Sequence, residues 1–241
     1  ITLVNSGAAS VPVASPGSGG GSNLNFNASE IVLGGGSQTI LGYDQVNLNA
    51  ANRVFVAGSG SLKLGAGTDV VDLNVATPKI LVAGATSKGS GSFAVSTLGR
   101  IIVADSALSG GVADRPADSA ETGGNLSFTA ADIIIGSTIQ AQAGTITLQA
   151  TTGNVSLAPR GYLSAAGYKK TLVDVDTYLS GGKVVLKSDA GNVWTDALSV
   201  IDVAQPADGF GYSGDIEVTA LAGTATLAGM MRGSGGPGLG G

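Results

Sequence analysis

The chain has no cysteine and no histidine, and aromatic and charged residues make up only 5% and 12% of its 241 residues. Without thiol or imidazole groups it cannot build disulfide scaffolds, iron–sulfur clusters, Cys/His zinc sites or histidine-based catalytic triads. Its hydrophobic share is nevertheless 43%, and its mean hydropathy is +0.33. Because disordered chains are poor in apolar residues and rich in charge, this composition predicts a folded protein.

Basic residues are few and dispersed. There are 12 Lys and Arg against 17 Asp and Glu, which gives a formal net charge of −5. Neutralising a phosphate backbone requires clustered cations, so we expect no nucleic-acid partner. No apolar run approaches the ~20 residues that span a bilayer. The chain begins with Ile1 rather than with a start methionine or a signal peptide, so we expect an internal piece of a longer protein.

Glycine is abundant, at 40 residues, and it helps to separate short apolar-x-apolar triplets that recur along the chain. Examples are Ile31-Val32-Leu33, Val54-Phe55-Val56 and Ile146-Thr147-Leu148. Alternation with period two, β-branched residues and turn residues between the triplets are typical of short strands with one buried face. No segment shows a sustained helical period, so the sequence predicts an all-β fold.

The triplets also repeat at longer range. Residues 124–130 match residues 144–150 position by position, and the pattern returns at 182–188 and 214–220. Within each repeat a second triplet follows the first, and often a third, and three short strands per repeat indicate a triangular coil. A period of 20–25 residues, with extra residues confined to particular corners, is characteristic of solenoids. We therefore expect a parallel β-helix (β-solenoid) of about eight coils.

The repeats also suggest an organisation for the whole chain. We expect a β-helix over residues 23–232, preceded by a partial coil and a Gly/Ser/Pro-rich lead-in at 1–22 and followed by a flexible Gly-rich tail at 233–241. The first triplets of the repeats begin at Leu24, Val46, Val71, Phe93, Leu126, Ile146, Val184 and Ile216. We expect the last four of these residues to stack as one interior ladder.

Carboxylate pairs are the candidate catalytic groups, because carbohydrate-cleaving enzymes use such pairs. Asp174/Asp176 and Asp215/Glu217 each place two acids on one strand face. No repeat stacks carboxylates at one position with a basic residue alongside, so an outward polar face explains them better.

The Gly-Asn pairs before strands are explained by positive φ at tight corners and by side-chain capping of the backbone. We expect no catalytic residue, cofactor or metal site, and the sequence leaves a calcium ion at Asp174 or Asp176 undecided.

Three loop insertions, at 109–122, 166–180 and 204–213, carry the unusual polar and aromatic residues. Exposed aromatic side chains stack on sugars or dock protein partners, although covering the flank of a rod is a simpler role for them. The candidate surface-interaction residues are Tyr168, Lys169, Lys170, Asp174, Asp176, Tyr178, Phe210 and Tyr212. Because the insertions follow different triplets, the sequence does not predict that they share one face.

Several repeats resemble the filamentous-haemagglutinin-like large exoproteins, a family of adhesins that Gram-negative bacteria secrete by the two-partner pathway. The resemblance is carried by GGNLSFTA (123–130), AGTITLQA (143–150), GNVSLA (153–158) and GDIEVTA (214–220), which are similar to the family's "Gly-Gly-x-Val-x-Leu-x-Ala … Gly-x-Val-x-Leu-Ala" coils. It covers residues 120–230 well and 23–108 more loosely. The family's Asn-Pro-containing amino-terminal secretion motif is not found, so the resemblance implies an internal or C-terminal segment.

The resemblance implies a right-handed parallel β-helix that is exported unfolded through an outer-membrane secretion partner and folds outside the cell. The implied role is a non-catalytic structural stalk or adhesion segment, secreted or at the bacterial cell surface, with host or neighbouring-cell glycans or proteins as partners. Two alternatives remain open. One is a polysaccharide-processing enzyme on the same fold, and the other is a surface-layer or filament subunit that associates end to end.

Overall fold

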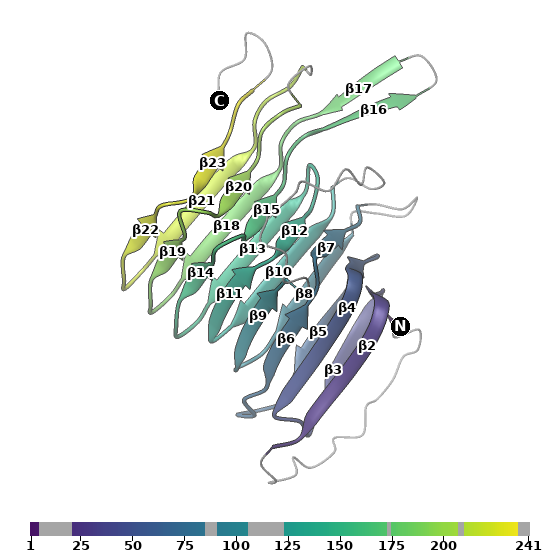
Figure 1. Ribbon diagram of the computed structural model, residues 1–241, viewed down its shortest axis with the longest axis vertical. Coiled ribbons are helices and arrows are strands. Elements are labelled where there is room, and N and C mark those ends of the chain that lie inside the picture. Colours follow the sequence, from purple (N-terminus) through teal and green to yellow (C-terminus); the bar gives the residue numbers. More distant parts are fainter. Residues whose placement is uncertain (5–20, 85–90, 106–122, 173–174, 207–209, 236–241) are drawn as a thin grey trace.

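The computed structural model describes residues 1–4, 21–84, 91–105, 123–172, 175–206 and 210–235. Within these residues the chain is all-β and contains no helix (Figure 1). The strands form two long sheets, in which every pair is parallel, and one antiparallel hairpin. The predicted all-β, parallel architecture is therefore confirmed.

A seven-stranded sheet takes one strand from each successive repeat. In chain order its strands are β3 (Gly36–Ile40), β5 (Gly60–Leu64), β8 (Ser92–Ser96), β10 (Asn125–Ala130), β13 (Thr145–Ala150), β18 (Lys183–Ser188) and β21 (Asp215–Ala220). Leu126 pairs with Ile146, Ile146 with Val184, and Val184 with Ile216. This register confirms the predicted interior ladder, and it excludes a sandwich of sequential antiparallel strands, because each partner lies one repeat away.

A fourteen-stranded sheet has two arms that share the long strands β2 (Asn23–Leu33) and β4 (Gln45–Val56). From the first half of β4 one arm continues through β6 (Asp72–Ala76), β9 (Arg100–Ala104), β11 (Asp132–Gly136), β14 (Val155–Leu157), β19 (Val193–Thr195) and β22 (Ala225–Leu227). From its second half the other arm continues through β7 (Lys79–Val82), β12 (Thr138–Gln140), β15 (Tyr162–Ser164), β20 (Val200–Asp202) and β23 (Met230–Arg232). The short strand β1 (Thr2–Leu3) pairs with the end of β2.

The core lies between these sheets and is built from alternate residues of each strand. In β11, for example, Ile133 and Ile135 are fully buried, whereas Ile134 between them faces outward and is half-buried. Ile133 stacks on Ile101 of β9 and on Val155 of β14. The period of two in the sequence therefore becomes a continuous column of β-branched side chains, as expected for strands with one buried face.

Part of the predicted list of repeat starts is wrong. Val46 pairs with Leu73 and not with Val71, which is buried in the corner before β6. In addition, Leu24, Val46 and Leu73 lie in the fourteen-stranded sheet, whereas Phe93 and the later starts lie in the seven-stranded sheet. The reason is that the triplets of one repeat are alike, so periodicity gives the length of the repeat but not which sheet a triplet joins.

The prediction of positive φ at the glycines of the Gly-Asn pairs is also wrong. The structure gives no positive φ to Gly124, Gly153 or Gly191. Instead, a Cβ atom on Gly191 would lie 2.4 Å from the backbone oxygen of Gly153 in the neighbouring repeat. Here glycine allows the backbones of successive repeats to approach closely. The predicted side-chain capping is confirmed at Asn154, whose Oδ1 accepts a hydrogen bond of 2.8 Å from the backbone N–H of Asn192.

Side-chain amides form a ladder on the outer face of the first arm. Asn47 Nδ2 donates to Asn25 Oδ1 at 2.7 Å, and Asn74 Nδ2 donates to Asn47 Oδ1 at 3.1 Å. In the adjacent column, Asn49 Nδ2 donates to Asn27 Oδ1 at 2.7 Å. The ladder therefore adds side-chain hydrogen bonds to the backbone pairing of β2, β4 and β6.

Candidate functional site

An antiparallel hairpin projects from the stack of parallel strands (Figure 1). It consists of β16 (Tyr168–Leu172) and β17 (Val175–Leu179), and Lys169 pairs with Tyr178 across it. The hairpin leaves the stack between β15 and β18, so it occupies the predicted insertion at 166–180. Because β15 and β18 belong to different sheets, the hairpin starts at a corner, where the inserted residues leave the strand pairing intact.

Four of the predicted surface residues meet on this hairpin. Lys169 Nζ lies 3.0 Å from Asp176 Oδ2 and 5.6 Å from the centre of the Tyr178 ring. The Tyr178 and Phe210 rings are edge to face, with centroids 6.0 Å apart and an interplanar angle of 83°. We call Lys169, Asp176, Tyr178, Phe210 and the neighbouring Tyr212 the hairpin cluster.

The third insertion brings Phe210 and Tyr212 to the base of the hairpin. Tyr212 accepts a hydrogen bond of 3.0 Å at its backbone oxygen from the N–H of Gly181, and its own N–H donates to Ser180 Oγ at 3.3 Å. Gln205 Nε2 donates to the backbone oxygen of Phe210 at 3.1 Å. These contacts fix the loop while leaving Phe210 and Tyr212 68% and 63% exposed.

The structure thus brings together residues from two insertions for which the sequence predicted no shared face. Both insertions connect the second arm of the fourteen-stranded sheet with the seven-stranded sheet, so they leave the same corner in consecutive repeats. Of the other predicted residues, Tyr168 is half-buried at the start of β16, and Lys170 contributes backbone pairing to β16. Asp174 and the whole insertion 109–122 lie outside the described residues.

The cluster has the chemistry of a recognition surface. Tyr178 and Phe210 offer ring faces and edges for stacking, and Lys169 and Asp176 offer a donor and an acceptor beside them. The Lys169 and Asp176 side chains are 32% and 40% exposed, so their ion pair contributes little to stability. Among the residues that the structure describes, no three His, Cys, Asp or Glu side chains are grouped as a metal site would require.

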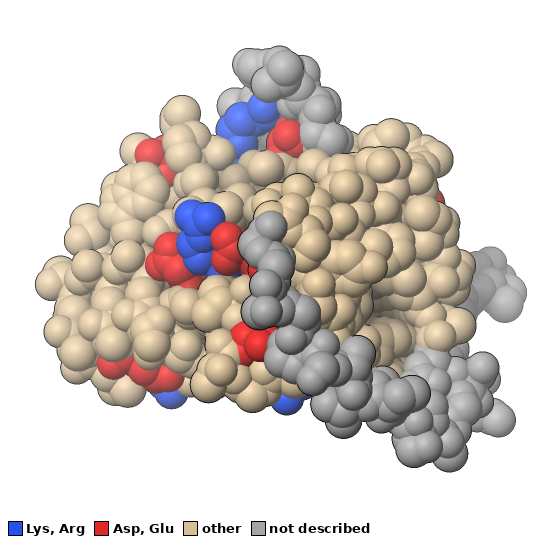
Figure 2. Space-filling view, turned by 90° about the horizontal axis from the view of Figure 1, so that it is seen from below, with Lys and Arg blue, Asp and Glu red and all other residues tan. Residues whose placement is uncertain are grey.

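Charged side chains elsewhere on the molecule are mostly paired. Figure 2 shows Lys and Arg beside Asp and Glu in small groups on an otherwise uncharged face. Lys183 Nζ lies 2.8 Å from Glu217 Oε2, and this hydrogen bond raises the pKa of Lys183 and lowers the pKa of Glu217. The pKa of Asp189 is likewise lowered, first by Lys187 and then by Gln149. These pairs join neighbouring strands or residues two positions apart, and they form no extended basic surface on the described part of the chain.

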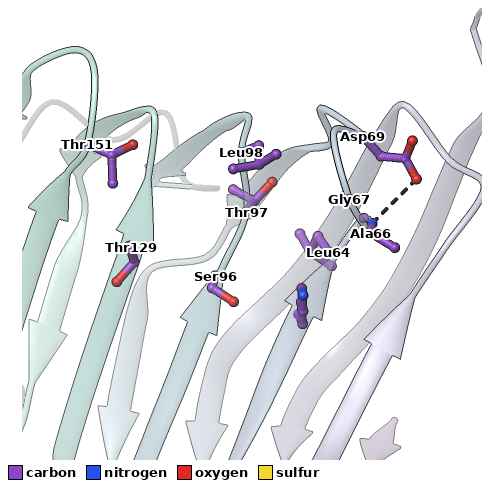
Figure 3. A pocket seen from close by; sticks show the side chains of 11 residues that line it. Leu64, Ala66, Gly67, Asp69, Ser96, Thr97, Leu98, Thr129 and Thr151 are labelled. Carbon is purple, nitrogen blue, oxygen red and sulfur yellow. Dashed lines mark hydrogen bonds between the residues drawn. The ribbon is translucent and has the colours of Figure 1, made fainter.

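A second candidate site was missed at the level of sequence. A groove of about 200 Å³ crosses several strands at the corner between the seven-stranded sheet and the first arm. One wall is the corner loop 65–70, and the floor comes from the ends of β5, β8 and β10 and from Thr151, which follows β13 (Figure 3). The interval of 25 residues between Val46 and Val71, longer than its neighbours, was the available signal for this loop.

No helix in the described ranges is long and apolar enough to cross a membrane. No protein-family model, curated protein or solved structure matches the chain.

Proposed function

We propose that this chain is a right-handed parallel β-helix of about eight coils that serves as a non-catalytic, adhesive segment of a large bacterial exoprotein. Crossovers between parallel strands are right-handed in about 98% of cases, which supports the handedness. The resemblance of the repeats to filamentous-haemagglutinin-like exoproteins supports the cellular setting: export through an outer-membrane partner and display in secreted form or at the cell surface.

The observation that carries the adhesive role is the hairpin cluster. A projecting hairpin contributes nothing to the pairing of successive repeats, yet it holds Tyr178 and Phe210 in edge-to-face contact beside Lys169. Loops on a rigid scaffold are the usual carriers of binding function. Partner recognition therefore explains the cluster better than coverage of the rod, because Phe210 and Tyr212 remain largely exposed. The partner is a glycan or a protein on a host or neighbouring cell.

The test is binding of the chain to a glycan array and to intact host cells. Replacing Tyr178 and Phe210 together by alanine should abolish binding. The matched control is Trp194→Ala, which removes an aromatic side chain that is 39% exposed on β19, away from the hairpin. Equal binding by the double variant and the native chain would contradict the assignment. If Trp194→Ala loses binding while the double variant retains it, the flat sheet and not the hairpin is the recognition surface.

The enzymatic alternative is tested by incubating the chain with acidic polysaccharides. The proposal predicts no release of reducing or unsaturated ends. Release that is abolished by changing a single Asp would overturn the non-catalytic assignment.

End-to-end association is a second candidate role, favoured by the C-terminal end of the stack. In the described part of the chain no strand pairs with the outer edges of β21, β22 and β23. Leu227, Met230 and Met231 on the last strands are 43%, 54% and 39% exposed. Unpaired edges with exposed apolar side chains are templates for strand addition, either by a further repeat of a longer chain or by a second copy of this one. Light scattering over a concentration series should show growing linear species if this role is real, and Met231→Lys should suppress them.

A further inference from the structure

The groove beside the corner loop 65–70 has a polar floor that is aligned across strands. Lys63 of β5 is in register with Ser96 of β8, and Ser96 is in register with Thr129 of β10. The three side chains therefore stand in one outward column, with steps of about 4.8 Å between strands. Figure 3 shows Ser96 and Thr129 on successive strands, with Asp69 and Gly67 on the overhanging loop.

Lys63 differs from cations elsewhere in the described chain that are paired with carboxylates. Arg100, Lys183 and Lys187 lie within 2.9 Å of a carboxylate oxygen. Lys63 is exposed and has neither an ion-pair nor a hydrogen-bond partner within the part of the chain that the structure describes. The groove therefore contains an ammonium group that forms no ion pair in the described part of the chain, although Asp69 lines the opposite wall.

The other side chains that line the groove provide hydroxyl groups, an apolar surface and one carboxylate. The hydroxyls of Ser96 and Thr129 make no hydrogen bond among the described residues, whereas that of Thr151 donates to the backbone oxygen of Ala130 at 3.1 Å and can still accept. Leu98 is 51% exposed and supplies apolar surface on the same side. On the opposite wall, Asp69 accepts a hydrogen bond of 3.3 Å from the backbone N–H of Ala66 at Oδ2.

We propose that this groove binds a short stretch of an acidic polysaccharide, with a uronate carboxylate on Lys63. Sugar hydroxyls would exchange hydrogen bonds with Ser96 and Thr129, and Leu98 would cover the apolar face of a ring. The spacing between strands is close to the length of one pyranose residue along an extended polysaccharide, so successive rings meet successive strands. A peptide is disfavoured because strands β5, β8 and β10 are paired on both sides and offer no edge to an added strand. The site is separate from the hairpin cluster, and its occupancy does not depend on the function proposed above.

The experiment is a calorimetric titration of the full chain with hexagalacturonate. We expect saturable binding that weakens as salt is raised, because an exposed Lys–carboxylate contact is screened. Lys63→Gln should weaken binding about tenfold, since one charge-assisted hydrogen bond is lost. The matched control is Lys187→Gln, which makes the same change in the same outward column but outside the groove. It should leave the affinity unchanged.

Two comparison ligands test the chemical class. Neutral maltohexaose should bind at least tenfold more weakly than hexagalacturonate, and hexaglutamate should not bind with comparable affinity. Absence of saturable binding to hexagalacturonate, or equal losses in Lys63→Gln and Lys187→Gln, would overturn the site. Equal affinity for hexaglutamate would overturn the assignment to a polysaccharide. Phe210→Ala should retain hexagalacturonate binding, so failure of the hairpin proposal and failure of this one give different results.

Discussion

The alternation of inward and outward residues can be tested on two adjacent isoleucines of one strand. Ile133 of β11 is fully buried between Ile101 and Val155, whereas Ile134 is half-buried on the outer face. Ile133→Ala and Ile134→Ala make the same chemical change at neighbouring positions. Any difference in the free energy of unfolding therefore reports the direction of each side chain and not the residue type.

The expected magnitude follows from burial. Ile133→Ala removes three carbon atoms from the core, which costs about 2.4 kcal/mol at ~0.8 kcal/mol per methylene. Close packing in the column prevents full collapse, so the residual cavity adds about 1 kcal/mol or more. The total of about 3–4 kcal/mol corresponds to a fall of roughly 6–16 °C in Tm for a chain of this size. Ile134→Ala should cost less than about 1 kcal/mol, because that side chain already contacts solvent.

The measurement is thermal and urea unfolding, followed by circular dichroism in the far ultraviolet. A larger loss for Ile134→Ala than for Ile133→Ala would refute the register of β11, because a slip of one residue exchanges the two faces. Equal losses would show that β11 is covered on both sides. Either result would contradict the parallel arrangement of this sheet, in which one face of β11 is buried.

Three further outcomes follow from the structure. Gly144→Ala should destabilise the fold by more than about 2 kcal/mol in urea unfolding, because its Cβ would lie 1.9 Å from the backbone oxygen of Gly124. Gly136→Ala should be tolerated, because the atom nearest to its Cβ would lie 3.6 Å away. The lowered pKa of Glu217 stabilises the folded chain above the ordinary pKa of glutamate, about 4.3, and this contribution is lost as pH falls through the lowered value. Glu217→Gln should therefore have a Tm that decreases less than that of the native chain between about pH 6 and about pH 3, and identical decreases would contradict the Lys183 pairing. Replacing residues 168–179 by a short Gly/Ser linker should change Tm by less than about 3 °C, because the hairpin lies outside the parallel pairing, and a large fall would show that it supports the stack.

The sequence by itself determined the direction of the side chains and the pairing of the later repeats. Residues 124–130 and 144–150 match position by position, and the structure pairs Leu126 with Ile146 as that match predicts. The reason is that parallel stacking places each strand on its copy one repeat away, so the repeat in the sequence is also the register of the sheet. The inward positions can also be predicted from the local sequence, because a period of two assigns each residue to one face of the strand.

The tertiary structure alone decided the phase of the early repeats and the composition of both candidate sites. Val71 and Leu73 have the same spacing pattern, and the longer corner at 65–70 determines which of them pairs with Val46. Phe210 meets Tyr178 because two insertions leave the same corner in consecutive repeats. Lys63 and Thr129 line one groove because β5, β8 and β10 pair in register and the corner loop 65–70 forms a wall beside them. Outward-facing residues carry no packing pattern that sequence periodicity can reveal, so their neighbours depend on where each loop leaves the stack.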